Sequence, residues 1–119
     1  MPVLASGSKF VTHATSLTTT SDTDCYVVPN NFSSHVEHLM IGNNNSSNKD
    51  YTLKYYEADT TTTHTLFSSH PVTGKGSESV FTVDKPLYLH EGDKIIISAE
   101  TANTLTVVVA AEEFFDPNR

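Results

Sequence analysis

Short apolar or alternating runs follow one another along this chain, separated by clusters of Asn, Ser, Thr, Asp and Gly. Alternation of apolar and polar residues is typical of a strand with one buried face, and the clusters contain the residues that form turns. No stretch repeats with the period of an amphipathic helix. The pattern predicts an all-β fold: about eight short strands in a single antiparallel β-sandwich, either Ig-like or jelly-roll-like.

The last third of the chain shows the pattern most clearly. Leu87–Leu89 leads into a turn at His90–Asp93, and the run Lys94–Ala99 is followed, after a turn at 101–103, by Leu105–Ala111. We expect this region to form a closing hairpin. Its alternation predicts one inward-facing set of side chains: Ile95, Ile97, Leu105, Val107 and Val109.

Two apolar residues break the polarity of the opposite face in that region. Ile96 and Val108 alternate with the inward set and would otherwise meet water. A strand whose second face is also apolar is covered by a loop or by another subunit. We therefore predict that Ile96 and Val108 contact a partner.

Earlier segments alternate more weakly but have clear ends. The expected strands are Lys9–Thr15, Asp24–Val28, His35–Ile41, Tyr51–Ala58, Thr63–Ser68 and Glu78–Val83. The segment Pro71–Gly76 reads as a flexible loop, so Val72 and Lys75 are candidate partner contacts at its tip. Phe114 and Phe115 are expected to dock on this domain or on a neighbour, because two adjacent phenylalanines are rarely left in water.

Length and cysteine count limit the architecture. With 119 residues and 37% hydrophobic content, the sequence predicts one domain over residues 1–119, with arms at 1–8 and 113–119. Cys25 is the single cysteine, which excludes an internal disulfide. A lone cysteine beside a strand is usually a small buried apolar residue, and we interpret Cys25 in that way.

Charge argues against two classes of partner. The formal net charge is −7, and Arg119 is the single arginine. Nucleic-acid binding needs a basic stripe, which the sequence lacks, and anionic membrane surfaces are disfavoured for the same reason. The start of the chain does not resemble a signal peptide, and no apolar run approaches the roughly 20 residues that span a bilayer.

Six histidines require a test for metal binding. His35 and His38 are three residues apart, so on a regular strand they point to opposite faces and cannot share an ion. The spacings typical of zinc or calcium sites are missing, as are nucleophile elbows, phosphate loops and dinucleotide fingerprints. The sequence therefore predicts no catalytic, cofactor-binding or metal-ligating residues, and we expect the protein not to be an enzyme.

Glycan binding is an alternative, because β-sandwiches often bind sugars. Sugar platforms usually need flat exposed aromatic side chains, and the chain has no tryptophan. Its tyrosines lie within strand patterns and are interpreted as core or face residues. A glycan partner is the less favoured prediction.

Five segments in order resemble small β-sandwich structural proteins of tailed bacteriophages. They are Tyr26–Pro29, Ile41–Asn44, Leu53–Tyr56, Leu87–Ile95 and Ala102–Val108, and the resemblance covers roughly residues 24–113. Segment 60–76 and the Phe114–Phe115 end lie outside the common pattern.

The resemblance implies a non-enzymatic virion protein in multiple copies, with no ligand-binding residues to carry over. Its members resemble capsid decoration subunits that bind the major coat protein, or adaptors at the neck, tail or fibre attachment. The implied partners are coat or tail proteins and copies of the chain itself. The implied location is the virion, after synthesis in the host cytoplasm.

Overall fold

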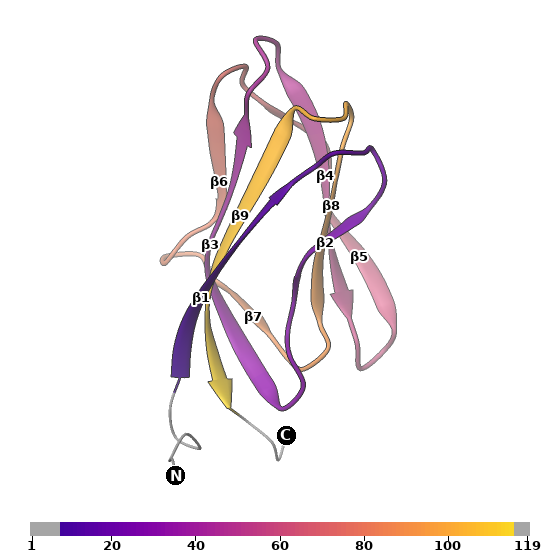
Figure 1. Ribbon diagram of the computed structural model, residues 1–119. Helices are drawn as coiled ribbons and strands as arrows, with labels where there is room; N and C mark the ends of the chain where they lie inside the picture. Colours follow the sequence, from indigo (N-terminus) through magenta and orange to yellow (C-terminus); the bar gives the residue numbers. More distant parts are fainter. Residues whose placement is uncertain (1–7, 116–119) are drawn as a thin grey trace.

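Two antiparallel sheets pack face to face in the computed structural model, which describes residues 8–115 (Figure 1). The strands are β1 (Ser8–Ser16), β2 (Thr23–Val27), β3 (Phe32–Asn43), β4 (Lys49–Glu57), β5 (Thr62–Val72), β6 (Ser77–Phe81), β7 (Leu87–Leu89), β8 (Lys94–Ala99) and β9 (Leu105–Phe115). The described chain has no helix, and the predicted all-β sandwich is confirmed.

Strand order identifies the type of sandwich. Sheet A has the order β1-β9-β3-β6, and β7 pairs with β3 beside β6. Sheet B has the order β2-β8-β4-β5. Because β6 and β7 pair with the same edge of β3, they act as two halves of one strand position. Each sheet thus has four strand positions, and the order is that of a jelly roll rather than an Ig domain.

The chain changes sheet at almost every connection. Within residues 8–115 the hairpin between β4 and β5 joins neighbours of one sheet, whereas β8 and β9 lie in different sheets. The predicted closing hairpin is therefore wrong. Alternation assigns side chains to a face but does not choose between a partner beside the strand and one across the core. The predicted inward set is confirmed, because those five residues are at most 2% exposed.

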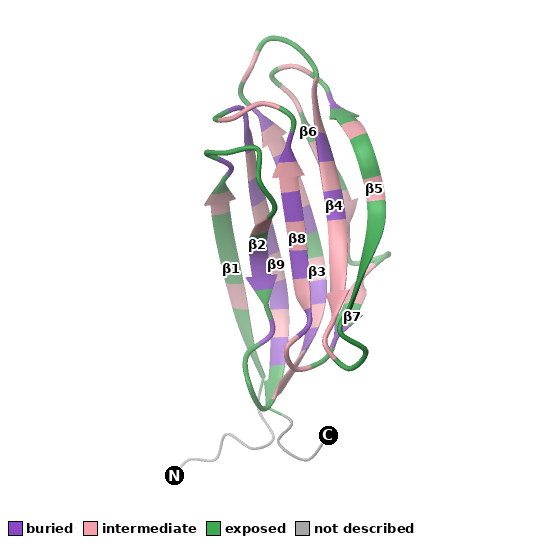
Figure 2. Cartoon of the chain, turned by 90° about the vertical axis from the view of Figure 1, so that its right-hand side faces the viewer, coloured by how far each residue is buried: buried purple, intermediate pink, exposed green. Residues whose placement is uncertain are grey.

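The core lies between the two inner faces, and Figure 2 shows its buried bands along β8, β4 and β9. Side chains such as Ile41 and Leu53 are 0% exposed. The strand β5 forms one edge of sheet B and, unlike the central strands, is exposed along most of its length (Figure 2). Its threonine-rich start fits that position, because β-branched polar residues suit a solvated edge.

Two loops at the end opposite the described termini hold each other (Figure 1). Backbone Gly74 N–H donates to Asn48 Oδ1 over 3.0 Å, and Lys75 N–H donates to the Asn45 carbonyl over 2.8 Å. The Lys75 ammonium also donates to the Asn44 carbonyl. Instead of a free flexible tip, this segment is a pinned loop.

Val72 does not belong to that loop. It ends β5 and is 1% exposed, packed in the core. The prediction that Val72 contacts a partner is wrong, because Pro71 and Val72 still pair with β4 in this structure. Lys75 is exposed, and its role as a partner contact stays a prediction.

Gly74 should be the least replaceable residue of this loop pair. An alanine Cβ there would lie 2.3 Å from the backbone oxygen of Ser46, which cannot yield as a flexible side chain does. We expect Gly74→Ala to destabilise the fold by about 1–3 kcal/mol. Gly42→Ala is the matched control, since its nearest neighbour would be 4.0 Å away. Urea unfolding measures the free energy of unfolding of the two variants. Equal losses of stability would show that the close approach of Gly74 to Ser46 does not determine the cost.

The predicted arms are shorter than expected where the structure describes them. β1 begins at Ser8 and β9 continues to Phe115, so residues 113–115 form strand rather than arm. Residues 1–7 and 116–119 of the predicted arms lie outside the described residues.

Candidate functional site

The outer face of sheet A carries a row of cross-strand neighbours near the end where the described chain starts and finishes. Phe10 of β1 is opposite Glu112 of β9, which is opposite His35 of β3, which is opposite Tyr88 of β7. Alternation places all four on the side away from the core, since Glu113 and Val36 next to them are buried. The register thus brings an imidazole, a carboxylate and two aromatic rings together.

A second carboxylate joins this row from β3 itself, because Glu37 is two residues from His35 and lies on the same face of the strand. The pairing of β3 with β9 shifts between Val36 and His38, which leaves Glu37 as an extra residue. Glu37 Oε2 lies 3.9 Å from His35 Nδ1. One ligand atom each from His35, Glu37 and Glu112 lie within 4.8 Å of one another. We call this group the His35 cluster.

The same bulge corrects an expectation about the histidines. Val36 and Leu39 are both buried, so the alternation changes phase between them, and His38 lies on the outer face with Met40 and Val108. His35 and His38 therefore share a face, and the prediction that they point to opposite faces is wrong. The alternation of the sequence gave no sign of the extra residue.

Aromatic side chains surround the His35 cluster. The Tyr88 ring stacks on the His35 ring with centroids 4.5 Å apart. Phe10 is 73% exposed, Tyr88 67% and Phe114 39%. Such large apolar groups in water mark an interaction surface when they gather on one face.

An apolar strip continues from there along the middle of sheet A. Val108 of β9 lies between Ala14 of β1 and Met40 of β3. With His38 and Ala110, Val108 and Met40 line a shallow hollow of about 60 Å³. We define the A face as the outer-face residues Phe10, Met40, Tyr88, Val108 and Phe114.

The predicted contact residues do not gather in one place. Val108 and Phe114 belong to the A face, whereas Ile96 lies on the outer side of sheet B. Ile96 is flanked by Asp24 and Lys54, which form ion pairs with Lys94 and Asp22. Ile96 and Val108 therefore cannot form one common apolar face, although each is half-buried on its own side.

Phe115 packs at the end of the sandwich. Its ring meets that of Phe32 edge-on, with centroids 5.6 Å apart, and it remains 36% exposed. Phe115 is thus partly docked on this domain, whereas Phe114 is 39% exposed on the A face.

The inner side of the same end holds a buried polar network. Glu113 is 2% exposed and points between the sheets, where Tyr26 donates a hydrogen bond of 2.6 Å to its Oε2. The Tyr26 and Ser34 hydroxyls are hydrogen-bonded at 2.8 Å, and Lys9 Nζ lies 3.9 Å from Glu113 Oε1. Burial, followed by the hydrogen bond to Glu113, raises the pKa of Tyr26. This network satisfies a buried carboxylate and fixes the end of β9 beneath the His35 cluster.

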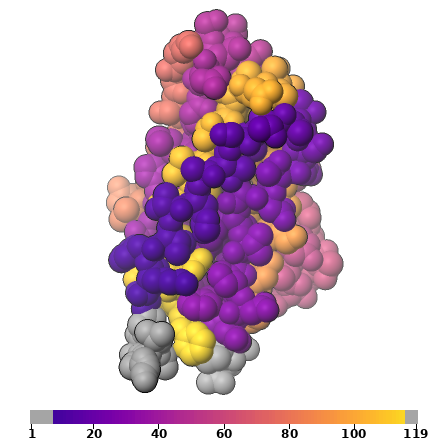
Figure 3. Space-filling view, viewed as in Figure 1, coloured from indigo at the N-terminus to yellow at the C-terminus, as the bar shows by residue number. Residues whose placement is uncertain are grey.

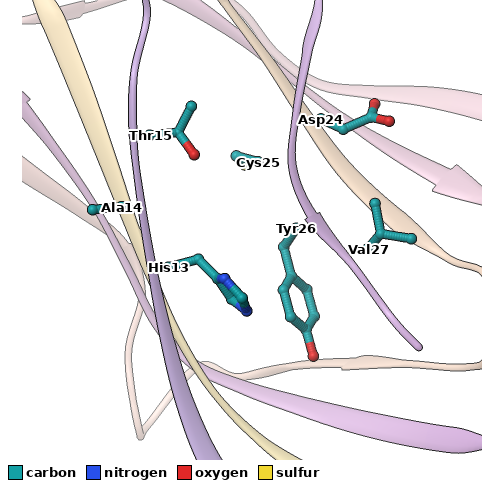
Figure 4. A pocket seen from close by; sticks show the side chains of 7 residues that line it. All are labelled: His13, Ala14, Thr15, Asp24, Cys25, Tyr26 and Val27. Carbon is teal, nitrogen blue, oxygen red and sulfur yellow. The ribbon is translucent and has the colours of Figure 1, made fainter.

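An open groove separates the edge strands β1 and β2 at the side of the sandwich. Figure 4 shows its lining, in which the His13 and Tyr26 rings lie side by side. The centroids of these two rings are 5.6 Å apart. The space-filling view shows β1 along the front of the molecule, with β9 visible on either side of it (Figure 3). Cys25 also lines this groove but is 4% exposed and donates from Sγ to the Ile95 carbonyl.

Cys25 is expected to be unreactive in the folded chain. Burial raises the pKa of its thiol to about 12, so roughly one thiol in ten thousand is ionised at pH 8. Ellman's reagent at pH 8 should react at least about 100-fold faster in denaturant than with native protein. A Ser68→Cys, Cys25→Ser variant, with its thiol on exposed β5, should react rapidly when folded. Rapid native reaction of Cys25 would contradict the buried assignment.

Comparison with known proteins gives fold similarity. No protein-family model and no curated protein matches the chain. A solved structure described as an endospore appendage pilus of Bacillus matches with a TM-score of 0.52 and 11% identity, over 92% of this chain and 87% of that one. At this identity the match shows the shared fold.

Two viral structures match more weakly. The infectious bursal disease virus Gx strain has a TM-score of 0.47 and 9% identity over 98% of this chain, which spans 33% of that protein. The extra small virus of the prawn Macrobrachium rosenbergii has a TM-score of 0.46 and 8% identity, over 96% and 82% of the two chains. In residues 8–115 no helix is long and apolar enough to span a bilayer.

Proposed function

We propose that this chain is a non-enzymatic structural subunit of a virion, made in the host cytoplasm, and more specifically a capsid decoration subunit that binds the major coat protein. The A face is the observation that carries the proposal. It presents three large aromatic side chains and an apolar strip on one face of sheet A. Jelly rolls are widespread in viral shells, and residues 24–113 resemble structural proteins of tailed phages.

The A face has the composition of a docking surface. Aromatic residues and methionine are enriched in the centres of interfaces, whereas lysine is depleted there, and the A face has the former without the latter. A shell presents many identical sites in fixed positions, so each contact need not be strong by itself. We therefore assign the A face to the coat protein.

The pilus similarity supports a role in repeated assembly, with one difference in chemistry. The matched protein is described as forming disulfide-linked pili. In this chain Cys25 is the single cysteine and is 4% exposed. Assembly of this subunit would therefore rest on non-covalent contacts.

Removing the aromatic groups tests the proposal. We expect the double variant Phe10→Ser, Phe114→Ser to fold but to lose most of its association with purified particles. Val83→Ser is the matched control, because Val83 is also 73% exposed but lies in the turn between β6 and β7. Equal binding of the double variant and the wild type would overturn the assignment of the A face.

A neck, tail or fibre-attachment adaptor is the alternative within the same class. The copy number of a capsid decoration protein follows that of the many coat subunits of the shell, whereas a neck or tail protein forms one small ring of few copies. The number of chains per particle separates the two roles directly.

Glycan binding is the alternative from another class, and Tyr88 is the residue that favours it. Its ring is 67% exposed and held by stacking on His35. That function predicts retention of the chain on a glycan array and loss of retention in Tyr88→Ala. Retention of wild type with loss in the variant would favour glycan binding over coat binding.

A further inference from the structure

The His35 cluster combines ligand types that suit one class of ion. Its potential donors are an imidazole nitrogen and two carboxylate oxygens from neighbouring strands. Calcium and magnesium prefer oxygen donors alone, whereas zinc and similar divalent transition metals readily accept nitrogen with oxygen. The donor set therefore favours a zinc-like ion over the two hard cations.

Geometry brings the donors near the required separation. Ligands about 2.1 Å from a tetrahedral ion are roughly 3.4 Å apart. The donor atoms here lie within 4.8 Å of one another, and His35 Nδ1 is 3.9 Å from Glu37 Oε2. Rotation of two long glutamate side chains is enough to close the remaining distance, because both are half-buried on an open face.

Neighbouring groups already orient two of the ligands. Ser8 donates a 2.7 Å hydrogen bond to Glu112 Oε2, which leaves Oε1 of that carboxylate for another partner. Tyr88 stacks on the His35 ring and limits its rotation. Supporting contacts of this kind hold ligands in place around bound metals.

Charge supplies a further, independent reason. In residues 8–115 no lysine or arginine forms an ion pair with Glu37 or Glu112, so two carboxylates stand close together without a fixed cation. A divalent ion bound at His35 Nδ1, the ring nitrogen that lies 3.9 Å from Glu37 Oε2, would supply the missing positive charge.

We propose that His35, Glu37 and Glu112 bind one divalent transition-metal ion of the zinc class on the outer face of sheet A. The three residues supply the protein ligands, and solvent completes the coordination. The ion links β3 to β9 beside the exposed rings of Phe10 and Tyr88. This site is independent of the identity of the protein that covers the A face.

Titration of the full chain with zinc tests the proposal. Protein freed of metal by a chelator and dialysed should bind one Zn²⁺ per chain by calorimetry and unfold at a higher temperature. Cobalt(II) should give visible absorption bands of a protein-bound ion at the same stoichiometry. Failure to bind either ion at millimolar concentration would overturn the proposal.

Variants separate this site from unspecific binding to an acidic protein. His35→Gln and Glu112→Gln should each weaken Zn²⁺ binding at least tenfold, while circular dichroism shows that they remain folded. His38→Gln and His64→Gln are the matched controls. His38 is a nearby histidine on the same face, whereas His64 lies on β5 and pairs with Glu57 of β4. Equal loss in controls and cluster variants would contradict the assignment, as would unchanged binding in the cluster variants.

Discussion

Leu53→Ala is expected to destabilise the fold by about 3 kcal/mol and to lower the melting temperature by about 10 °C. Leu53 is 0% exposed and sits in the middle of β4, between Phe67 on β5 and Ile97 on β8. Truncation removes buried apolar contacts and leaves a cavity that rigid neighbouring strands cannot fill. Urea unfolding followed by circular dichroism measures the change.

A second leucine provides the control for that experiment. Leu66 lies on the edge strand β5 and is 40% exposed, so Leu66→Ala should cost less than about 1 kcal/mol. Similar losses for the two variants would contradict the placement of the core between the sheets.

Asp93→Ala is the second substitution expected to have a large effect, of about 3 kcal/mol. Asp93 is 2% exposed; its Oδ1 accepts a hydrogen bond from Ala58 N–H, and its Oδ2 accepts from His90 N–H and the Tyr55 hydroxyl. Removing the carboxylate leaves these donors unpaired and releases the turn from the end of β4. Asp84→Ala, at an exposed turn, is the control and should be nearly neutral.

Tyr55 gives this prediction an independent readout. Burial, followed by the nearby carboxylates of which Asp93 is the first, raises the pKa of Tyr55 to about 12. Asp93→Asn keeps the size of the side chain but removes its charge, so the pKa of Tyr55 should fall toward its usual value of 10.0. Ultraviolet titration measures this shift. An unchanged titration curve would show that the charge of Asp93 does not act on Tyr55.

The sequence predicted which face of each strand is buried more reliably than which strands pair with each other. Alternation placed Ile95, Ile97 and Val107 in the core correctly, because each strand has one buried side. It did not show that β8 and β9 lie in different sheets, since a strand across the core satisfies the same alternation. It also treated Val72 as a loop residue, although pairing with β4 carries β5 on to that position.

The candidate site escaped sequence reasoning for a similar reason. His35 and Glu112 are 77 residues apart and meet because of the register between β3 and β9. The position of His38 on the same face depends on a bulge that no turn residue in the sequence indicates. The one available signal was that His35 and Glu37 are two residues apart, which places them on one face of a strand. Phe114 was predicted as a partner contact, which stays a prediction, whereas Phe10 was not singled out although it is 73% exposed on the same face.

The number of copies of this chain in purified virus particles tests the central claim most directly. Quantitative mass spectrometry of gradient-purified particles, calibrated with a labelled peptide of this chain, gives that number relative to the coat protein. The proposed decoration role predicts a fixed ratio near that of the coat protein, retained through repeated gradients. Recovery of the chain in the host lysate alone, with none in the particles, would contradict its assignment as a virion subunit.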